Sequence, residues 1–146
     1  MMSQIATLRR GLAGILAGAA LLGLVACGTN SDRQRVEVGL STFGMALSTN
    51  TVQAGPVTFV VRNTATDQTH EFVVAQTDLP ADQIPVNPDT HLIDEEQLTL
   101  LGEVEDLGSG ALKRLTLDLS PGRYVLICNL ATHYQNGMHT ELTVTP

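Results

Sequence analysis

The feature that most constrains the fold is an alternation of apolar and polar residues with a period of two. A period of two is the repeat of a β-strand buried on one face, and a continuous apolar run is typical of a central strand covered on both faces. The alternating segments are residues 36–40, 57–61, 115–119 and 142–144, and the continuous runs are 70–75 and 123–130.

Turn signals separate these segments, as at Ala54-Gly55-Pro56 and Ser120-Pro121-Gly122. Short strands punctuated in this way predict an all-β Greek-key β-sandwich of about seven to eight strands. One segment departs from the pattern, because residues 76–106 contain 9 of the 15 acidic residues. We expect an acidic insertion there that covers one end of the sandwich, with a short helix or an edge strand over residues 94–107. A functional loop is the alternative.

The N-terminus has the features of an export signal. Arg9 and Arg10 precede a 16-residue apolar run, residues 11–26, which is short for a membrane span and typical of a signal peptide. The run ends in Leu-Val-Ala-Cys27, which resembles the lipobox of bacterial lipoproteins, in which the cysteine is lipidated. An ordinary secretory peptide with an incidental cysteine is the alternative.

These features predict the organisation and location of the chain. We expect a membrane-anchored lipoprotein of the cell envelope, facing the periplasm or the exterior. Its predicted parts are a signal peptide over 1–26, a lipidated cysteine and polar tether over 27–34, and one domain over 35–146.

The charge balance argues against nucleic acid as a partner. The chain has 8 Lys and Arg and 15 Asp and Glu, so without Arg9 and Arg10 the charge is 6 − 15 = −9. An acidic surface repels both nucleic acid and anionic lipid. Attachment to a membrane would therefore depend on the lipid at Cys27.

One short segment gathers three potential metal ligands. Cys128, His133 and Met138 lie in CNLATHYQNGM with four residues between each pair, and His70 opens an upstream strand. If Cys27 is lipidated, Cys128 has no disulfide partner, so in an oxidising compartment it needs burial or a metal. Two histidines, a cysteine and a weak axial methionine are the ligands of a blue-copper electron-transfer centre.

The two ligand segments resemble those of the cupredoxins, the family of small blue copper proteins. NTATDQTHEFVV is similar to the first-histidine segment, and SPGRYVLICNLATHYQNGMHTELTV to the C-terminal ligand loop. The resemblance implies one copper ion cycling between Cu(I) and Cu(II), with His70, Cys128, His133 and Met138 as ligands. It also implies that His133 lies near the surface and is the exit for the electron.

The sequence departs from the family pattern at two places. Glu71 stands where Asn or Ser usually follows the first histidine, and Ala131-Thr132 replaces a common Pro-Gly pair. Both changes leave the ligands in place, but they alter the surroundings that set a reduction potential.

The resemblance implies electron transfer, which the export signal would place in the cell envelope, and we expect a redox protein such as a cytochrome or an oxidase as partner. We expect no enzymatic activity and no small-molecule substrate, because protein ligands would occupy every coordination position of the copper and the sequence contains no catalytic motif. Copper delivery or buffering is the alternative, although only Met45, His91 and His139 remain as spare ligands in the predicted mature chain, residues 27–146. A metal-free sandwich used for binding is a third possibility.

Overall fold

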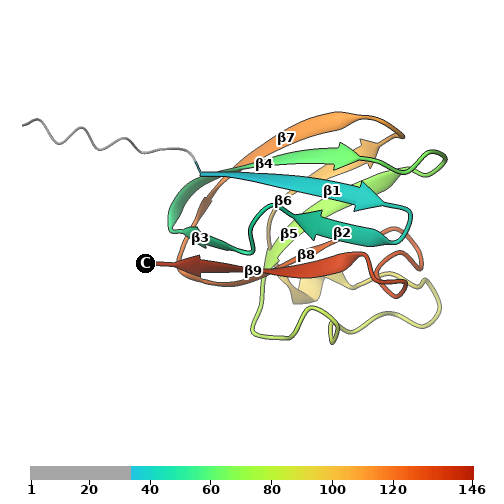
Figure 1. The fold of residues 1–146 in the computed structure, drawn as a ribbon. Helices are drawn as coiled ribbons and strands as arrows, with labels where there is room; N and C mark the ends of the chain where they lie inside the picture. The colour runs from blue at the N-terminus through green and yellow to red at the C-terminus, as the bar shows by residue number, and fades with distance from the viewer. Residues whose placement is uncertain (1–33) are drawn as a thin grey trace, which may run out of the picture. The chain divides into compact units, whose positions relative to one another are not determined.

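The structure, a computed structural model, describes residues 34–146, which form two β-sheets packed face to face (Figure 1). The predicted signal peptide over 1–26, the predicted lipidation site Cys27 and most of the tether lie outside the described residues. Within residues 34–146 no helix is long and apolar enough to cross a membrane.

Nine strands make up the two sheets. The four-stranded sheet has the order β2-β1-β4-β7, with bounds β1 Gln34–Ser41, β2 Gly44–Leu47, β4 Gly55–Asn63 and β7 Leu112–Leu119. The five-stranded sheet has the order β3-β9-β8-β5-β6, with bounds β3 Thr51–Gln53, β5 His70–Gln76, β6 Thr99–Leu107, β8 Gly122–Ile127 and β9 His139–Thr145. Both sheets are mixed, because β1 pairs with β4 and β3 with β9 in parallel.

The predicted all-β sandwich is confirmed, with more strands than expected. The additional elements are β2 and β3, of 4 and 3 residues. Segments this short carry too few alternations to be recognised from a period of two.

The main core lies between the sheets, where alternate side chains of both meet. Val36, Val38 and Leu40 of β1 belong to it, as do Phe72 and Val74 of β5. The rings of Phe59 and Phe72 meet across the core with centroids 5.3 Å apart. The period of two therefore identified the inward faces of β1, β4, β7 and β9 correctly.

A second apolar cluster lies on the outer face of the five-stranded sheet. Here Val73 and Ile127 point away from the main core and are covered by the β5–β6 connection, residues 77–98. Because both of their faces are buried, β5 and β8 have the continuous apolar runs seen in the sequence. The buried apolar residues of the connection that provide this cover are Ala81, Ile84 and Ile93, and the partly buried Val86 and Leu98 pack beside them.

The acidic segment therefore differs from the prediction in its placement. It holds both expected elements, a 3₁₀-helix at Glu95–Gln97 and β6 as an edge strand with two register irregularities opposite β5. The segment covers a face of the sheet, however, and not merely one end of the sandwich. This segment was classed by its acidic residues, and the packing of its buried apolar residues on that face was not recognised from the sequence.

Truncation of a core ring should cost much more stability than truncation of an exposed one. Phe59 is fully buried, so Phe59→Ala should lower the free energy of unfolding by about 3–5 kcal/mol. Phe43 is 46% exposed, and Phe43→Ala should cost no more than about 0.5 kcal/mol. Denaturant titration of both variants without metal measures the difference, and equal losses would contradict the described core.

Candidate metal centre

His70 is placed by β5 and by the turn that precedes it. Asn63, at the end of β4, is buried and donates from Nδ2 to the carbonyls of Gln68 (2.7 Å) and Leu107 (2.8 Å). Its Oδ1 accepts from the backbone N–H of Ala65 at 2.9 Å. Leu107 is the β6 partner of His70. One satisfied buried amide therefore fixes the turn and the strand on either side of this histidine.

The ligand loop, residues 128–138, joins β8 to β9 and closes on itself through backbone hydrogen bonds. The N–H of Cys128 donates to the carbonyl of Met138 at 3.0 Å, and the N–H of Met138 donates to that of His133 at 3.1 Å. These bonds bring the three residues together although four others separate each pair. Cys128 and Met138 are both fully buried.

Two imidazoles and a thiol converge at this end of the sandwich. Nδ1 of His70 lies 3.3 Å from Nδ1 of His133, and Sγ of Cys128 lies 4.0 Å and 3.4 Å from these two atoms. The three ligand atoms all lie within 4.8 Å of one another. A metal ion bonded at about 2.0–2.3 Å to nitrogen and sulfur would hold such donors roughly 3–4 Å apart. The donor set thus fits one ion, and the adjacent Met138 offers a thioether.

The surroundings of the three donors disfavour charge. Burial lowers the pKa of His70 from 6.5, with a further lowering from His133 and an opposing contribution from the backbone of Ser41. Burial likewise lowers the pKa of His133 and raises that of Cys128 above 9.0, while backbone N–H groups of Glu71 and Leu130 oppose this increase. Without a metal, both imidazoles are neutral at pH 7 and the thiol keeps its proton.

Glu71 connects the two ligand segments, even though it replaces the Asn or Ser expected there. Its backbone N–H donates to Sγ of Cys128 at 3.4 Å, and its carboxylate accepts from the N–H of Asn129 at 3.0 Å. Burial raises the pKa of Glu71, with the Asn129 bond opposing and nearby Glu95, Glu103 and Glu105 reinforcing the increase. At this position a longer, acidic side chain thus links the segment of His70 to the segment of Cys128.

His133 is half-buried beneath an exposed aromatic ring. Phe43, in the β1–β2 turn, packs edge-on against the imidazole with centroids 6.0 Å apart. Tyr134 does not join this exposed surface, because its ring is only 5% exposed and packs in the second cluster. The residue exposed beside His133, Phe43, was missed because it lies 90 positions away in the sequence.

The other potential ligands lie outside the trio. His91 is exposed, and Met45 is partly buried against the main core. His139 is partly buried with its ring 4.9 Å from that of Tyr134. Among the described residues, only His70, Cys128 and His133 form a cluster of histidine, cysteine or acidic side chains able to hold a metal.

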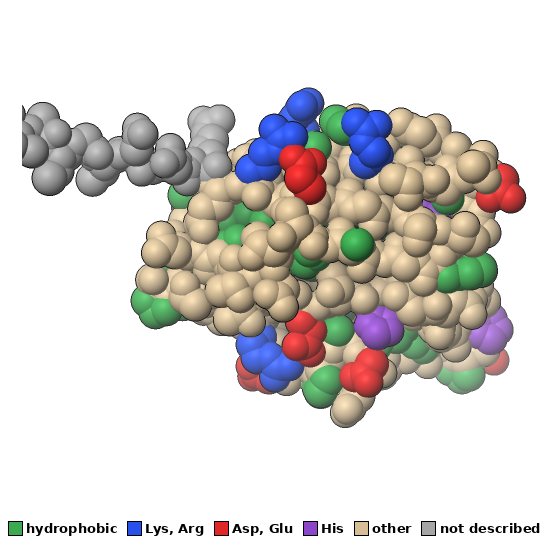
Figure 2. Space-filling view, in the orientation of Figure 1, with side chains coloured by type: hydrophobic (Ala, Val, Ile, Leu, Met, Phe, Trp, Pro, Cys, Tyr) green, Lys and Arg blue, Asp and Glu red, His purple; other side chains and the backbone are tan. Residues whose placement is uncertain are grey.

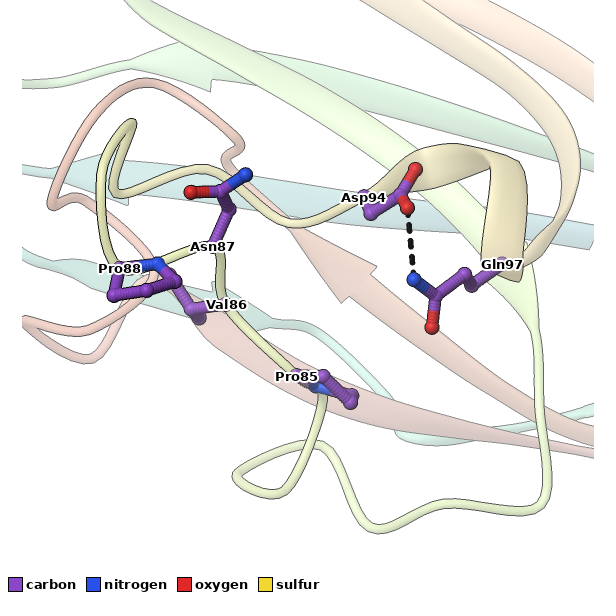
Figure 3. A pocket seen from close by; sticks show the side chains of 6 residues that line it. All are labelled: Pro85, Val86, Asn87, Pro88, Asp94 and Gln97. Carbon is purple, nitrogen blue, oxygen red and sulfur yellow. Dashed lines mark hydrogen bonds between the residues drawn. The ribbon is translucent and has the colours of Figure 1, made fainter.

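A hollow of about 200 Å³ lies within the β5–β6 connection (Figure 3). The amide of Gln97 donates to the carboxylate of Asp94 across one side of it at 2.7 Å. None of the candidate ligands lines this hollow, which is bounded by Pro85, Val86, Asn87, Pro88, Asp94 and Gln97.

Charge is distributed unevenly over the two sheets. Most basic side chains in Figure 2 gather along the edge where β1, β4 and β7 run. These strands carry four of the five Lys and Arg of residues 34–146, which are Arg35, Arg62, Lys113 and Arg114. The acidic side chains instead concentrate on the β5–β6 connection and β6, the part of the chain next to the ligand loop.

Comparison with known proteins identifies the fold. No protein-family model matches the sequence, and no curated protein matches it. Among solved structures, auracyanin of the photosynthetic bacterium Roseiflexus castenholzii is 25% identical, with a TM-score of 0.59 over 77% of this chain and 98% of that one. Auracyanin A of Chloroflexus aurantiacus, described as a "blue" copper protein, is 18% identical, with a TM-score of 0.57 over 76% and 98%.

Rusticyanin of Thiobacillus ferrooxidans is 19% identical, with a TM-score of 0.57 over 76% of each chain. The predicted cupredoxin fold is therefore confirmed.

Proton release on metal binding tests the charge states of the three donors. At about pH 7.5, Zn²⁺ should release about one proton per ion, because only the Cys128 thiol has a proton to lose. Further release should appear only as the pH falls below the ordinary histidine value of about 6.5. A weakly buffered indicator titration measures it, with Cys128→Ser as control, and release of two protons at pH 7.5 would contradict neutral histidines.

Proposed function

We propose that this chain is a mononuclear type 1 copper protein that transfers single electrons between redox partners. The observation that carries the proposal is the convergence of two imidazole nitrogens and one thiol at 3.3–4.0 Å within an apolar end of a cupredoxin fold. His70, Cys128 and His133 would bind the ion. Met138 would add its thioether as a weaker fourth ligand.

Bound copper would supply a one-electron change between Cu(I) and Cu(II), and the chain would keep that change from moving its ligands. Cys128 and Met138 are excluded from solvent, so little water has to reorganise around them. Backbone hydrogen bonds fix both ends of the ligand loop, and His70 is held by a strand. A rigid ligand set suits the coordination preferences of Cu(I) and Cu(II) about equally. Because the ligands then move little when the oxidation state changes, the barrier to electron transfer is low.

The electron would leave or enter through His133. It is the one member of the trio that is not fully buried, and its ring contacts the exposed Phe43. A partner docked over Phe43 would therefore approach the copper through one imidazole.

Copper delivery is the less favoured function. A delivery protein needs a site from which an acceptor can withdraw the ion, whereas three of the four proposed ligands, His70, Cys128 and Met138, have no exposed surface. The spare residues do not form a second site, because His91 and His139 lie outside the ligand cluster. We propose no enzymatic activity, since four protein ligands would leave no position for a substrate.

We further propose that the protein is exported and anchored in the cell envelope through lipid on Cys27. The lipobox-like segment ending at Cys27 supports this location. The redox partner, such as a cytochrome or an oxidase, would present a basic or dipolar surface to the acidic side chains near the ligand loop.

Copper(II) added to the metal-free protein should give an intense visible band from thiolate-to-copper charge transfer, with one ion bound per chain. Cys128→Ser should abolish the band. His91→Asn should retain it, because His91 is exposed and Asn tolerates its backbone φ of 58°. Absorption and electron paramagnetic resonance spectra measure the result, and a colourless wild type would refute a type 1 centre.

Electron exchange with a basic c-type cytochrome should slow as salt is added, because salt screens the attraction of the acidic segment. The double variant Glu103→Gln/Glu105→Gln should show a weaker salt dependence. Stopped-flow kinetics at several ionic strengths measures both proteins. A rate independent of salt would show that these charges do not steer the encounter.

A further inference from the structure

Two residues of the ligand loop, neither of them a proposed ligand, bind the β5–β6 connection. Asn129 directly follows Cys128, and Tyr134 directly follows His133. Their side chains hydrogen-bond to residues 34 to 53 positions earlier in the chain. The connection therefore contacts the loop at the two residues adjacent to its thiol and its imidazole.

The side chain of Asn129 forms a pair of hydrogen bonds with the backbone of the connection, similar to the bonds between neighbouring β-strands. Its Oδ1 accepts from the N–H of Ile93 at 2.7 Å, and its Nδ2 donates to the carbonyl of Ile93 at 3.0 Å and to Glu95 at 2.7 Å. Its backbone N–H donates to the carboxylate of Glu71. Both N–H groups of the Asn129 side-chain amide are hydrogen-bonded, so the side chain of the residue that follows Cys128 is held in one orientation.

Tyr134 anchors the other half of the loop. Its hydroxyl donates to the carbonyl of Ala81 at 2.7 Å and accepts from the N–H of Ile84 at 2.9 Å. The ring is buried in the second apolar cluster. Removal of the hydroxyl would leave a backbone donor and an acceptor unpaired in a buried position, which is a costly change.

Backbone strain lies between these two anchors. Thr132 has a φ of 70°, a conformation that a β-branched residue rarely adopts. Its N–H donates at 3.2 Å to the carbonyl of His91, which itself has a φ of 58°. Strained residues persist only where the surrounding structure holds them, and here the anchors lie on both sides of Thr132.

We propose that Asn129 and Tyr134 are positioning residues through which the β5–β6 connection holds Cys128 and His133 in the geometry of the metal centre. This inference rests on the proposed copper function for its spectroscopic consequences. It assigns a structural role to the β5–β6 connection, which is to fix the conformation of the ligand loop. The contact through Glu71 fixes the same loop from β5.

The test compares Tyr134→Phe and Asn129→Ala with Tyr124→Phe. Tyr124 is a matched control, because it is also a buried tyrosine whose hydroxyl donates to a backbone carbonyl, that of Ser120 at 2.8 Å. It lies on β8 and contacts neither the loop anchors nor the connection through that hydroxyl. All three variants should lose stability, but only the first two should disturb the metal centre.

Two measurements separate positioning from stability. In the metal-free protein, the amides of Cys128 and Met138 should exchange with solvent about tenfold faster in Tyr134→Phe and Asn129→Ala than in wild type, through local opening. In the copper-loaded protein, the visible bands should shift in relative intensity and the copper hyperfine splitting should change. Tyr124→Phe should leave both measurements at their wild-type values.

Unchanged spectra and unchanged loop exchange in both anchor variants would overturn the inference. Equal effects in Tyr124→Phe would overturn it as well, because the changes would then follow global stability. A wild type without the visible band would refute the proposed copper function instead, and the exchange measurement without metal would still decide whether the connection holds the loop.

Discussion

The central constraint on the structure is to hold two imidazoles and a thiol within 4 Å of one another at a largely buried position. Apolar burial disfavours the charged form of each group, so the bare site is neutral. Such a site cannot assemble from local sequence, since His70 lies 58 positions before Cys128. It requires two neighbouring strands, β5 and β8, with one histidine as the first residue of β5 and the cysteine directly after the last residue of β8.

The loop is supported from both sides. On one side, the main core surrounds Cys128 and Met138. On the other side, the β5–β6 connection buries three apolar residues on the sheet and pairs with Asn129 and Tyr134. Burial holds the connection in place, and its hydrogen bonds then fix the loop. Stability and site geometry thus come from the same contacts.

The parts of this arrangement that follow a local rule could be predicted from the sequence. A period of two identified the main strands, and the spacing and order of four soft or borderline ligands identified the site. The path of residues 77–98 over the sheet could not be predicted, because the apolar residues that pack there are irregularly spaced along the sequence. The burial of Tyr134 could not be predicted either, since it depends on contacts with this distant segment. The left-handed backbone conformation of Thr132 could not be predicted either, because glycine is the usual sequence signal for that conformation and none stands at this position.

The irregular edge strand β6 also affects the tendency of the protein to self-associate. An unpaired edge offers backbone groups to a strand of another chain. Here Lys113 of β7 donates to the β6 carbonyl of Glu105, and a Cβ at Gly102 would come within 2.9 Å of Leu117 on the opposite sheet. The glycine lets the two sheets approach at this border, and the lysine occupies a hydrogen-bonding position there. Together with the glutamates of β6, they leave a poor template for fibrillar self-association.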